Sequence, residues 1–135
     1  MKLFDQTTYS DPKAGTHGDC FRAAIRTLAQ QDMPDLPHPI GPDGWNYAFY
    51  DVLEDTYGLI VKHNVNRKGK DWSFLPRVVL ATGLTERSDP ETGQPKHSVV
   101  WDRIADRMIH DPHPSRAGLI SITMFHWLAL GETHD

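Results

Sequence analysis

The sequence predicts an α+β protein in which N-terminal helices pack on a small antiparallel β-sheet. Two stretches in the first part of the chain carry apolar residues at helical spacing, and both lie before Gly58. After Gly58 the pattern changes to short apolar runs separated by polar turns, which is typical of antiparallel strands. Helices first and strands afterwards indicate the α+β class.

The first predicted helix begins at Cys20 and ends near Gln30 or Gln31. Its apolar residues follow the i, i+3, i+4, i+7 spacing of an amphipathic helix, and they are Phe21, Ala24, Ile25 and Leu28. The prolines that follow cannot continue a helix, so we expect an irregular loop over 32–44. The apolar face of this helix should pack on the sheet.

A second helix is predicted from Trp45 to Tyr57. Apolar residues again share one face, while Glu54 and Asp55 occupy the other. Gly58 directly follows and is suited to the left-handed conformation that ends many helices. Both predicted helices therefore precede every predicted strand.

Four strands are predicted after Gly58, at residues 59–65, 77–81, 97–101 and 107–110. The strand at 77–81 should end at Thr82-Gly83, and residues 84–96 should form a mobile, hydrophilic hairpin loop. Residues 102–106 should form the turn between the last two strands. Residues 72–75 have no assigned state, and residues 119–130 fit either a strand or a short helix followed by a strand.

Composition narrows the class of protein. Hydrophobic residues make up 39% of the chain and charged residues 24%, which is ordinary for a soluble globular protein. The net charge is −4 and no dense run of lysine or arginine occurs, so we expect no nucleic acid as partner. No apolar stretch approaches the ~20 residues that a membrane-spanning helix needs.

The chain of 135 residues is long enough for one domain with its own core. We therefore expect a single domain over 1–135, in which residues 1–19 form a polar N-terminal arm. The N-terminus has no long apolar run of the secretory type, and the single cysteine excludes an internal disulfide. These features predict a cytoplasmic protein with a reduced thiol.

The single cysteine, Cys20, lies at the start of the first predicted helix. Two glycines, a histidine and an aspartate precede it in a polar loop. The free N–H groups and the dipole at a helix N-terminus favour negative charge and lower the pKa of a thiol. This position predicts a reactive cysteine, since a structural one belongs in mid-helix among apolar residues.

A histidine and an aspartate flank the last predicted hairpin at equal distances. Both His97 and Asp111 lie seven residues from position 104, at the centre of the turn. Pairing about this turn sets the two residues opposite each other across the sheet. Nucleophilic cysteine catalysis needs a thiolate, a histidine and a group that orients the histidine. The sequence therefore predicts a Cys20–His97–Asp111 triad.

This order of cysteine helix, histidine strand and acid resembles the papain-like cysteine peptidase superfamily, and more narrowly small phage and prophage proteins of that fold. The resembling stretches span nearly the whole chain: Asp5-Gln6-Thr7, Gly18-Asp19-Cys20-Phe21-Arg22-Ala23, Ala81-Thr82-Gly83-Leu84, His97-Ser98-Val99-Val100 and His110-Asp111-Pro112-His113-Pro114-Ser115. The resemblance implies that Cys20 is the nucleophile, that His97 is the general base and acid, and that Asp111 orients His97. It also implies a phage-encoded protein that acts on a host or phage protein.

Papain-like enzymes also stabilise the oxyanion with a glutamine upstream of the cysteine. Gln6 is the candidate here, together with the backbone N–H of Cys20, although His17 or Asp19 could supply the polar contact instead. The residues expected to contact substrate are Asp19, Gly83, Trp101 and His113, with the loop at 84–96 as a recognition element.

The resemblance implies hydrolysis of an amide or isopeptide bond without a cofactor. The expected substrate is an extended peptide or a protein tail, and the same triad also supports deamidation and transglutamination.

Two other classes of function stay open at this point. Six residues are plausible zinc ligands for a zinc hydrolase: His17, Cys20, His97, His110, Asp111 and His113. Against this class, no pair of histidines occurs at the H-x-x-x-H spacing of a metal-binding helix. The third class is a non-catalytic binding or inhibitor protein that kept the fold, and the complete set of cysteine, histidine and aspartate argues against it.

Overall fold

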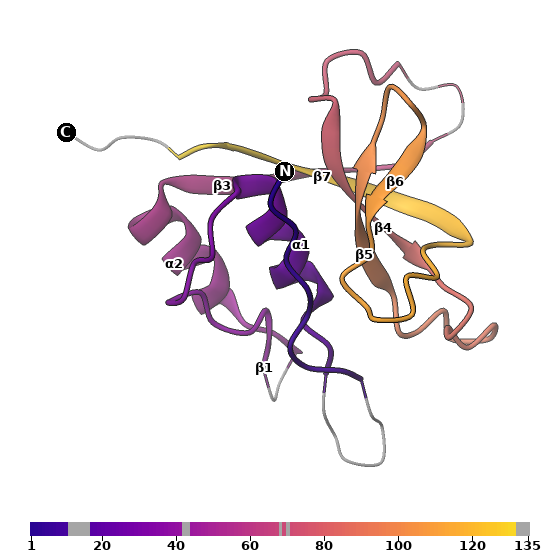
Figure 1. Ribbon diagram of the computed structural model, residues 1–135, viewed down its shortest axis with the longest axis horizontal. Helices are drawn as coiled ribbons and strands as arrows, with labels where there is room; N and C mark the ends of the chain where they lie inside the picture. Colours follow the sequence, from indigo (N-terminus) through magenta and orange to yellow (C-terminus); the bar gives the residue numbers. More distant parts are fainter. Residues whose placement is uncertain (11–16, 42–43, 68, 70, 132–135) are drawn as a thin grey trace.

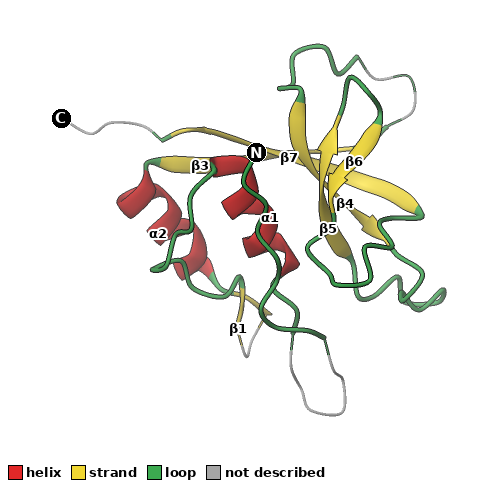
Figure 2. Ribbon diagram, in the orientation of Figure 1, coloured by secondary structure: helices red, strands yellow, loops and turns green. Residues whose placement is uncertain are grey.

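The computed structural model describes residues 1–10, 17–41, 44–67, 69 and 71–131. Its architecture is α+β, as predicted, with the helices near the start of the chain (Figures 1 and 2). The elements in order are α1 (Cys20–Ala29), β1 (Ile40–Gly41), β2 (Gly44–Trp45), α2 (Tyr47–Tyr57), β3 (Leu59–Val65), β4 (Val78–Leu84), β5 (His97–Asp102), β6 (Arg107–His110) and β7 (Ser121–Leu130). Parts of the predicted arm and of the loop at 32–44, residues 11–16 and 42–43, lie outside the described residues.

The two helices begin and end close to the predicted positions. Helix α1 starts at Cys20, and Gln30 ends it in the left-handed conformation with φ 57°. Helix α2 starts two residues later than predicted, because Trp45 pairs in β2 and Asn46 is the N-cap, accepting the Ala48 N–H at 3.2 Å. Gly58 ends α2 with φ 70°, as its sequence position predicts. Among the described residues, no helix is long and apolar enough to cross a membrane.

Five strands form an antiparallel sheet with the order β3-β7-β4-β5-β6. Residues 119–130, whose state the sequence left open, supply β7, which lies between β3 and β4. Strands β4, β5 and β6 pair in their order along the chain, β4 with β5 and β5 with β6. Strand β7 completes the sheet through non-local pairings with β3 and β4.

Strand β4 continues beyond the Thr82-Gly83 end that the sequence predicts, and this prediction is wrong. The strand reaches Leu84, and its register with β7 shifts between Thr82 and Gly83. A side chain at position 83 would collide with the carbonyl of Ser121. Gly83 therefore allows a close approach of two backbones inside a strand.

Helix α1 packs its apolar face on the sheet, as predicted. Phe21 and Ile25 are buried in one cluster with Leu80 of β4 and Val100 of β5, and α2 closes this cluster with Phe49. Figure 1 shows both helices on one side of the molecule, with β4, β5 and β6 on the other. This packing directs the first residue of α1 toward the start of β5.

A second cluster lies around Val99 and Phe125. The segment at 72–75, for which the sequence predicted no state, contributes Leu75 to this cluster and packs Trp72 against the ring of Phe125 at 5.5 Å between centroids. Trp101 packs against the same cluster.

Candidate active site

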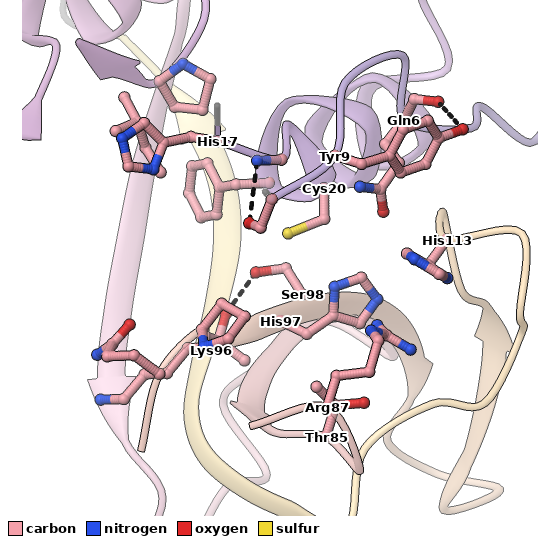
Figure 3. A pocket seen from close by; sticks show the side chains of 18 of the residues that line it. Gln6, Tyr9, His17, Cys20, Thr85, Arg87, Lys96, His97, Ser98 and His113 are labelled. Carbon is pink, nitrogen blue, oxygen red and sulfur yellow. Dashed lines mark hydrogen bonds between the residues drawn. The ribbon is translucent and has the colours of Figure 1, made fainter. Parts of the chain in front are cut away.

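A cavity of about 1040 Å³ opens at the start of α1. Its walls come from the N-terminal arm, the first turn of α1, strands β1 and β2, the loop at 85–96 with the start of β5, and the middle of β7, together with Thr82 and His113. Figure 3 shows Cys20 at the centre of this space, with His97 beside it. The cavity is therefore built where the helix meets the sheet.

Cys20 and His97 come together through the packing of α1 on β4 and β5. Cys20 is a half-buried free thiol at the first residue of α1. His97 is the first residue of β5, only 5% exposed, and its imidazole lies beside the Cys20 side chain (Figure 3). The Nε2 atom of His97 faces Asp111, so Nδ1 is the ring nitrogen left for the sulfur.

His97 and Asp111 form a buried ion pair. The Nε2–Oδ1 distance is 2.5 Å, and Asp111 is only 1% exposed. Burial lowers the pKa of His97, but the hydrogen bond to Asp111 and the neighbouring Cys20 outweigh burial and raise this pKa from 6.5 to about 9. Burial raises the pKa of Asp111, but hydrogen bonds from His97, His113 and Gly118 lower it to about 2. The pair is therefore charged at neutral pH.

This contact forms in a different register from the predicted one. From Val100 and His110 onward, β5 and β6 pair in a register shifted by one residue, so β6 carries a bulge. Continuing the shifted register sets Asp111 opposite Val99. Val99 lies two residues after His97 on the same strand, so the side chains of His97 and Asp111 lie on the same side of the hairpin. Without the extra residue, the Asp111 side chain would lie on the other side. The predicted direct pairing of His97 with Asp111 is wrong, although the two side chains do meet.

Backbone groups hold Asp111 in place. The N–H of His113 donates to Oδ1 at 2.9 Å and the N–H of Gly118 donates to Oδ2 at 2.8 Å. Arg116 donates to the Asp111 carbonyl at 2.5 Å and pairs with Asp5 of the N-terminal arm. Contacts that do not involve His97 therefore already hold the Asp111 carboxylate in place.

Gln6 lines the cavity and is 94% buried, with an exposed fraction of 6%. Its Nε2 donates one N–H to the Thr8 carbonyl at 2.9 Å, which leaves the second N–H of this amide. Its Oε1 is buried and has no hydrogen-bond partner among the described residues. A side chain at Gly18 would contact Nε2 at 3.1 Å, so this glycine gives the carboxamide its room beside the cysteine loop. The 14-residue separation from Cys20 is therefore closed by the fold.

Asp19, which the sequence analysis expected to contact substrate, does not line the cavity, and this prediction is wrong. Its side chain is fully buried and forms a salt bridge to Arg22 at 2.8 Å. It also accepts the backbone N–H groups of Thr7 and Thr8 at 2.8 and 2.9 Å. Although Asp19 is the N-cap of α1, its carboxylate makes no cap hydrogen bond, because it holds the N-terminal arm instead.

Two more residues expected to contact substrate lie elsewhere. Gly83 is buried against the backbone of β7, and Trp101 packs in the second cluster; neither lines the cavity. His113, the fourth, does line it, and its ring stands edge-on to His97 at 6.1 Å between centroids. His17, named as an alternative polar contact, also lines the cavity.

Sequence reasoning missed an aromatic wall and an arginine. The ring of Phe21, directly after Cys20, meets Trp45 at 5.8 Å and His126 at 5.2 Å, and all three line the cavity. Burial lowers the pKa of His126 to about 4, helped by the nearby His63, so this imidazole is neutral at neutral pH. Arg87 lines the cavity from the loop at 85–96. Only the position of this loop next to His97 indicated such a role.

The zinc alternative needs at least three ligands that converge. Within the described part of the chain, no group of three or more histidines, cysteines or carboxylates is arranged to hold a metal ion. His110, one of the proposed ligands, instead contacts Asp5 at 2.9 Å. Its side chain therefore secures the N-terminal arm.

The chain matches no protein-family model, no curated protein and no solved structure. The resemblance to papain-like peptidases therefore stays a prediction. The chemistry of the site has to be inferred from its own residues.

Proposed function

We propose that this protein is a papain-like, cysteine-dependent hydrolase that cleaves an amide or isopeptide bond. The observation that carries the proposal is the position of the His97 imidazole, which lies beside Cys20 in the cavity and contacts the Asp111 carboxylate through Nε2 (Figure 3). A nucleophile, a base within hydrogen-bond reach and a group that orients the base are the requirements of nucleophilic catalysis.

The charge on His97 supports thiolate chemistry. With a pKa of about 9, the imidazole is protonated at neutral pH, and a neighbouring cation favours the thiolate over the thiol. Asp111 stays ionised far below neutral pH and stabilises this cation, with Nε2 as its donor. The buried pair thus keeps the proton on the imidazole while the sulfur is the nucleophile.

The reaction follows from these positions. The Cys20 Sγ attacks the carbonyl carbon, and the oxyanion accepts hydrogen bonds from the Cys20 backbone N–H and from the unused N–H of Gln6 Nε2. His97 Nδ1–H protonates the leaving amine as the C–N bond breaks and a thioester forms. In the second half of the reaction, His97 accepts a proton from water while the water oxygen attacks the thioester carbonyl. The C–S bond then breaks, which releases the carboxylic acid and restores the Cys20 sulfur and the protonated His97.

Alkylation tests the thiolate. Iodoacetamide should modify Cys20 at pH 6 at least about tenfold faster than it modifies glutathione, because an unpaired thiol has a pKa of about 8.5. His97→Gln should bring the rate close to that of glutathione. His63→Gln is the matched control, since His63 is exposed on β3 and does not line the cavity. A wild-type rate no faster than that of glutathione would overturn the proposal.

Product analysis tests the bond. A defined mixture of peptides is incubated with the wild-type protein and with Cys20→Ala, and the products are identified by mass spectrometry. New peptide ends that appear only with the wild type would show hydrolysis. Loss of a side-chain amide without a new end would show deamidation, and crosslinked peptides would show transfer. Identical spectra for the two proteins would contradict an enzyme acting on peptides.

A further inference from the structure

The cavity has a charge opposite to that of the chain. The protein carries 18 acidic and 14 basic residues. Among the described residues that line the cavity, however, there are Arg87, Lys96 and four histidines, but no aspartate or glutamate. One of these histidines, His97, is charged at neutral pH. A cavity lined in this way attracts anions.

Arg87 has no carboxylate partner among the described residues. Arg22, Arg77 and Arg116 each form a salt bridge with an aspartate there, whereas the other arginines, Arg87 among them, and Lys96 form none. The Arg87 guanidinium donates to the Ser115 hydroxyl at 3.0 Å, which leaves its other N–H groups for a ligand. A guanidinium binds a carboxylate with two parallel hydrogen bonds.

Contacts fix which end of the cavity is basic. Ser115 accepts from Arg87 and contacts His113 Nδ1 at 2.9 Å, and the His113 ring adjoins His97. Figure 3 shows Arg87 and His113 beyond His97 as seen from Cys20. The aromatic wall around Phe21 lies instead on the side of the helix. The cavity therefore has a basic end next to His97 and an apolar end next to Cys20.

We infer that the substrate carries a carboxylate on the leaving-group side of the cleaved bond, and that Arg87 binds it. The assignment to this side rests on the proposed function: His97 has to reach the leaving nitrogen, so the groups beyond His97 contact the residue that follows the bond. The carboxylate is either an acidic side chain or the free C-terminus of the substrate. The aromatic wall contacts the acyl part, for which it favours an apolar side chain.

Two alkylating reagents of nearly equal size test the anion site without any substrate. Iodoacetate is an anion and iodoacetamide is neutral, so the ratio of their rates at Cys20 reports the local charge and cancels changes in thiolate content. Arg87→Gln should lower this ratio about threefold at low salt, and high salt should reduce the difference. Arg107→Gln is the matched control, since Arg107 is exposed on β6 and does not line the cavity.

The two proposals fail in different ways in this experiment. Slow reaction with both reagents would contradict the proposed function, but the ratio would still report on Arg87. A ratio that is the same in wild type, Arg87→Gln and Arg107→Gln would overturn the anion site, whatever the absolute rates. If Arg87→Gln unfolds, Lys96→Gln lowers the cavity charge by the same amount from an exposed position, and its ratio should also fall.

Synthetic peptides then distinguish the two sources of the carboxylate. Each peptide contains a bond that the protein cleaves in the peptide mixture. In the first pair this bond is followed by Glu or by Gln within the chain. In the second pair it is followed by a terminal residue with a free or an amidated C-terminus. We expect the wild type to cleave the acidic peptide of one pair at least about tenfold faster than the amide peptide of the same pair. Arg87→Gln should abolish this preference. Equal cleavage of acid and amide in both pairs would overturn the assignment to the leaving-group side.

Discussion

Two buried aspartates hold opposite walls of the cavity, and their surroundings are alike. Asp19 on the helix side is fully buried, and Asp111 on the hairpin side is 1% exposed. Each accepts two backbone N–H groups from a neighbouring loop, and each pairs with a cation at 2.8 Å or less. Hydrogen bonds outweigh burial in both cases and lower the pKa of each carboxyl. Burial and hydrogen bonding therefore do not tell the two apart.

The cation is what differs. Asp19 pairs with Arg22, whose guanidinium does not release its proton in a protein. Asp111 pairs with His97, which titrates and lies beside Cys20 (Figure 3). The first pair can only fix the N-terminal arm to α1, whereas the second fixes a group that can exchange a proton. The partner of a buried carboxylate thus separates a structural role from a chemical one.

The largest expected effect is the loss of cleavage on Asp111→Asn. The side-chain amide of this variant would no longer stabilise a charged His97. We therefore expect the rate at which a peptide from the defined mixture is cleaved to fall by about 10³-fold or more. Asp102→Asn is the matched control, because Asp102 pairs with Arg77 at the far end of β5. Cleavage of Asp111→Asn within tenfold of the wild-type rate would remove the distinction between the two aspartates.

Asp19→Asn should instead act on stability. Arg22 would lose its only ion pair among the described residues, so the free energy of unfolding should fall by about 3 kcal/mol. Urea denaturation measures this change. Cleavage per folded molecule should stay within a few-fold of the wild type, since Asp19 does not line the cavity. A large loss of cleavage with unchanged stability would assign Asp19 a direct role in the reaction.

The pH dependence of stability sharpens the comparison further. The pKa of His97 is raised from 6.5 to about 9, so its contribution is complete below pH 6.5 and lost as the pH rises toward 9. The pKa of Asp111 is lowered from 3.8 to about 2, so its contribution is lost as the pH falls from about 4 to 2. Only the alkaline loss is specific to the hairpin side, because the cation on the helix side is a guanidinium, a group that keeps its proton in proteins.

Urea denaturation between pH 6 and 9 measures this alkaline loss. We expect the free energy of unfolding of the wild type to fall across this range and that of His97→Gln to change much less. The same alkaline slope in both proteins would assign it to another group.

The smallest expected effect tests a single contact of the helix side. Thr7→Val keeps the shape of the side chain but removes the hydroxyl that donates to Asp19 Oδ2 at 2.9 Å. The free energy of unfolding should fall by about 1 kcal/mol, and cleavage should not change. Thr56→Val, at an exposed position of α2, controls for the substitution itself. Equal effects of the two substitutions would show that the contact contributes nothing.

Local patterns in the sequence determined a large part of the fold. Helical spacing and flanking prolines or glycines define both helices, and the polar turn at 102–106 defines the hairpin of β5 and β6. These signals are short-range, because capping, turn chemistry and side-chain period act over a few residues. They suffice to bring His97 close to Asp111 and to set Cys20 at the first residue of α1.

Only the tertiary structure decided which side chains share the cavity. One extra residue in β6 determines on which side of the hairpin the Asp111 side chain lies. The alternation of side chains along a strand does not reveal such an extra residue in the sequence. The Asp19 carboxylate binds the N-terminal arm because Thr7, Thr8 and Arg22 converge on it. Thr7 and Thr8 lie 12 and 11 residues before Asp19, and no local pattern in the sequence indicates this contact. Arg87 reaches Ser115, 28 residues later in the sequence, for the same reason: contacts between distant residues depend on how the elements pack.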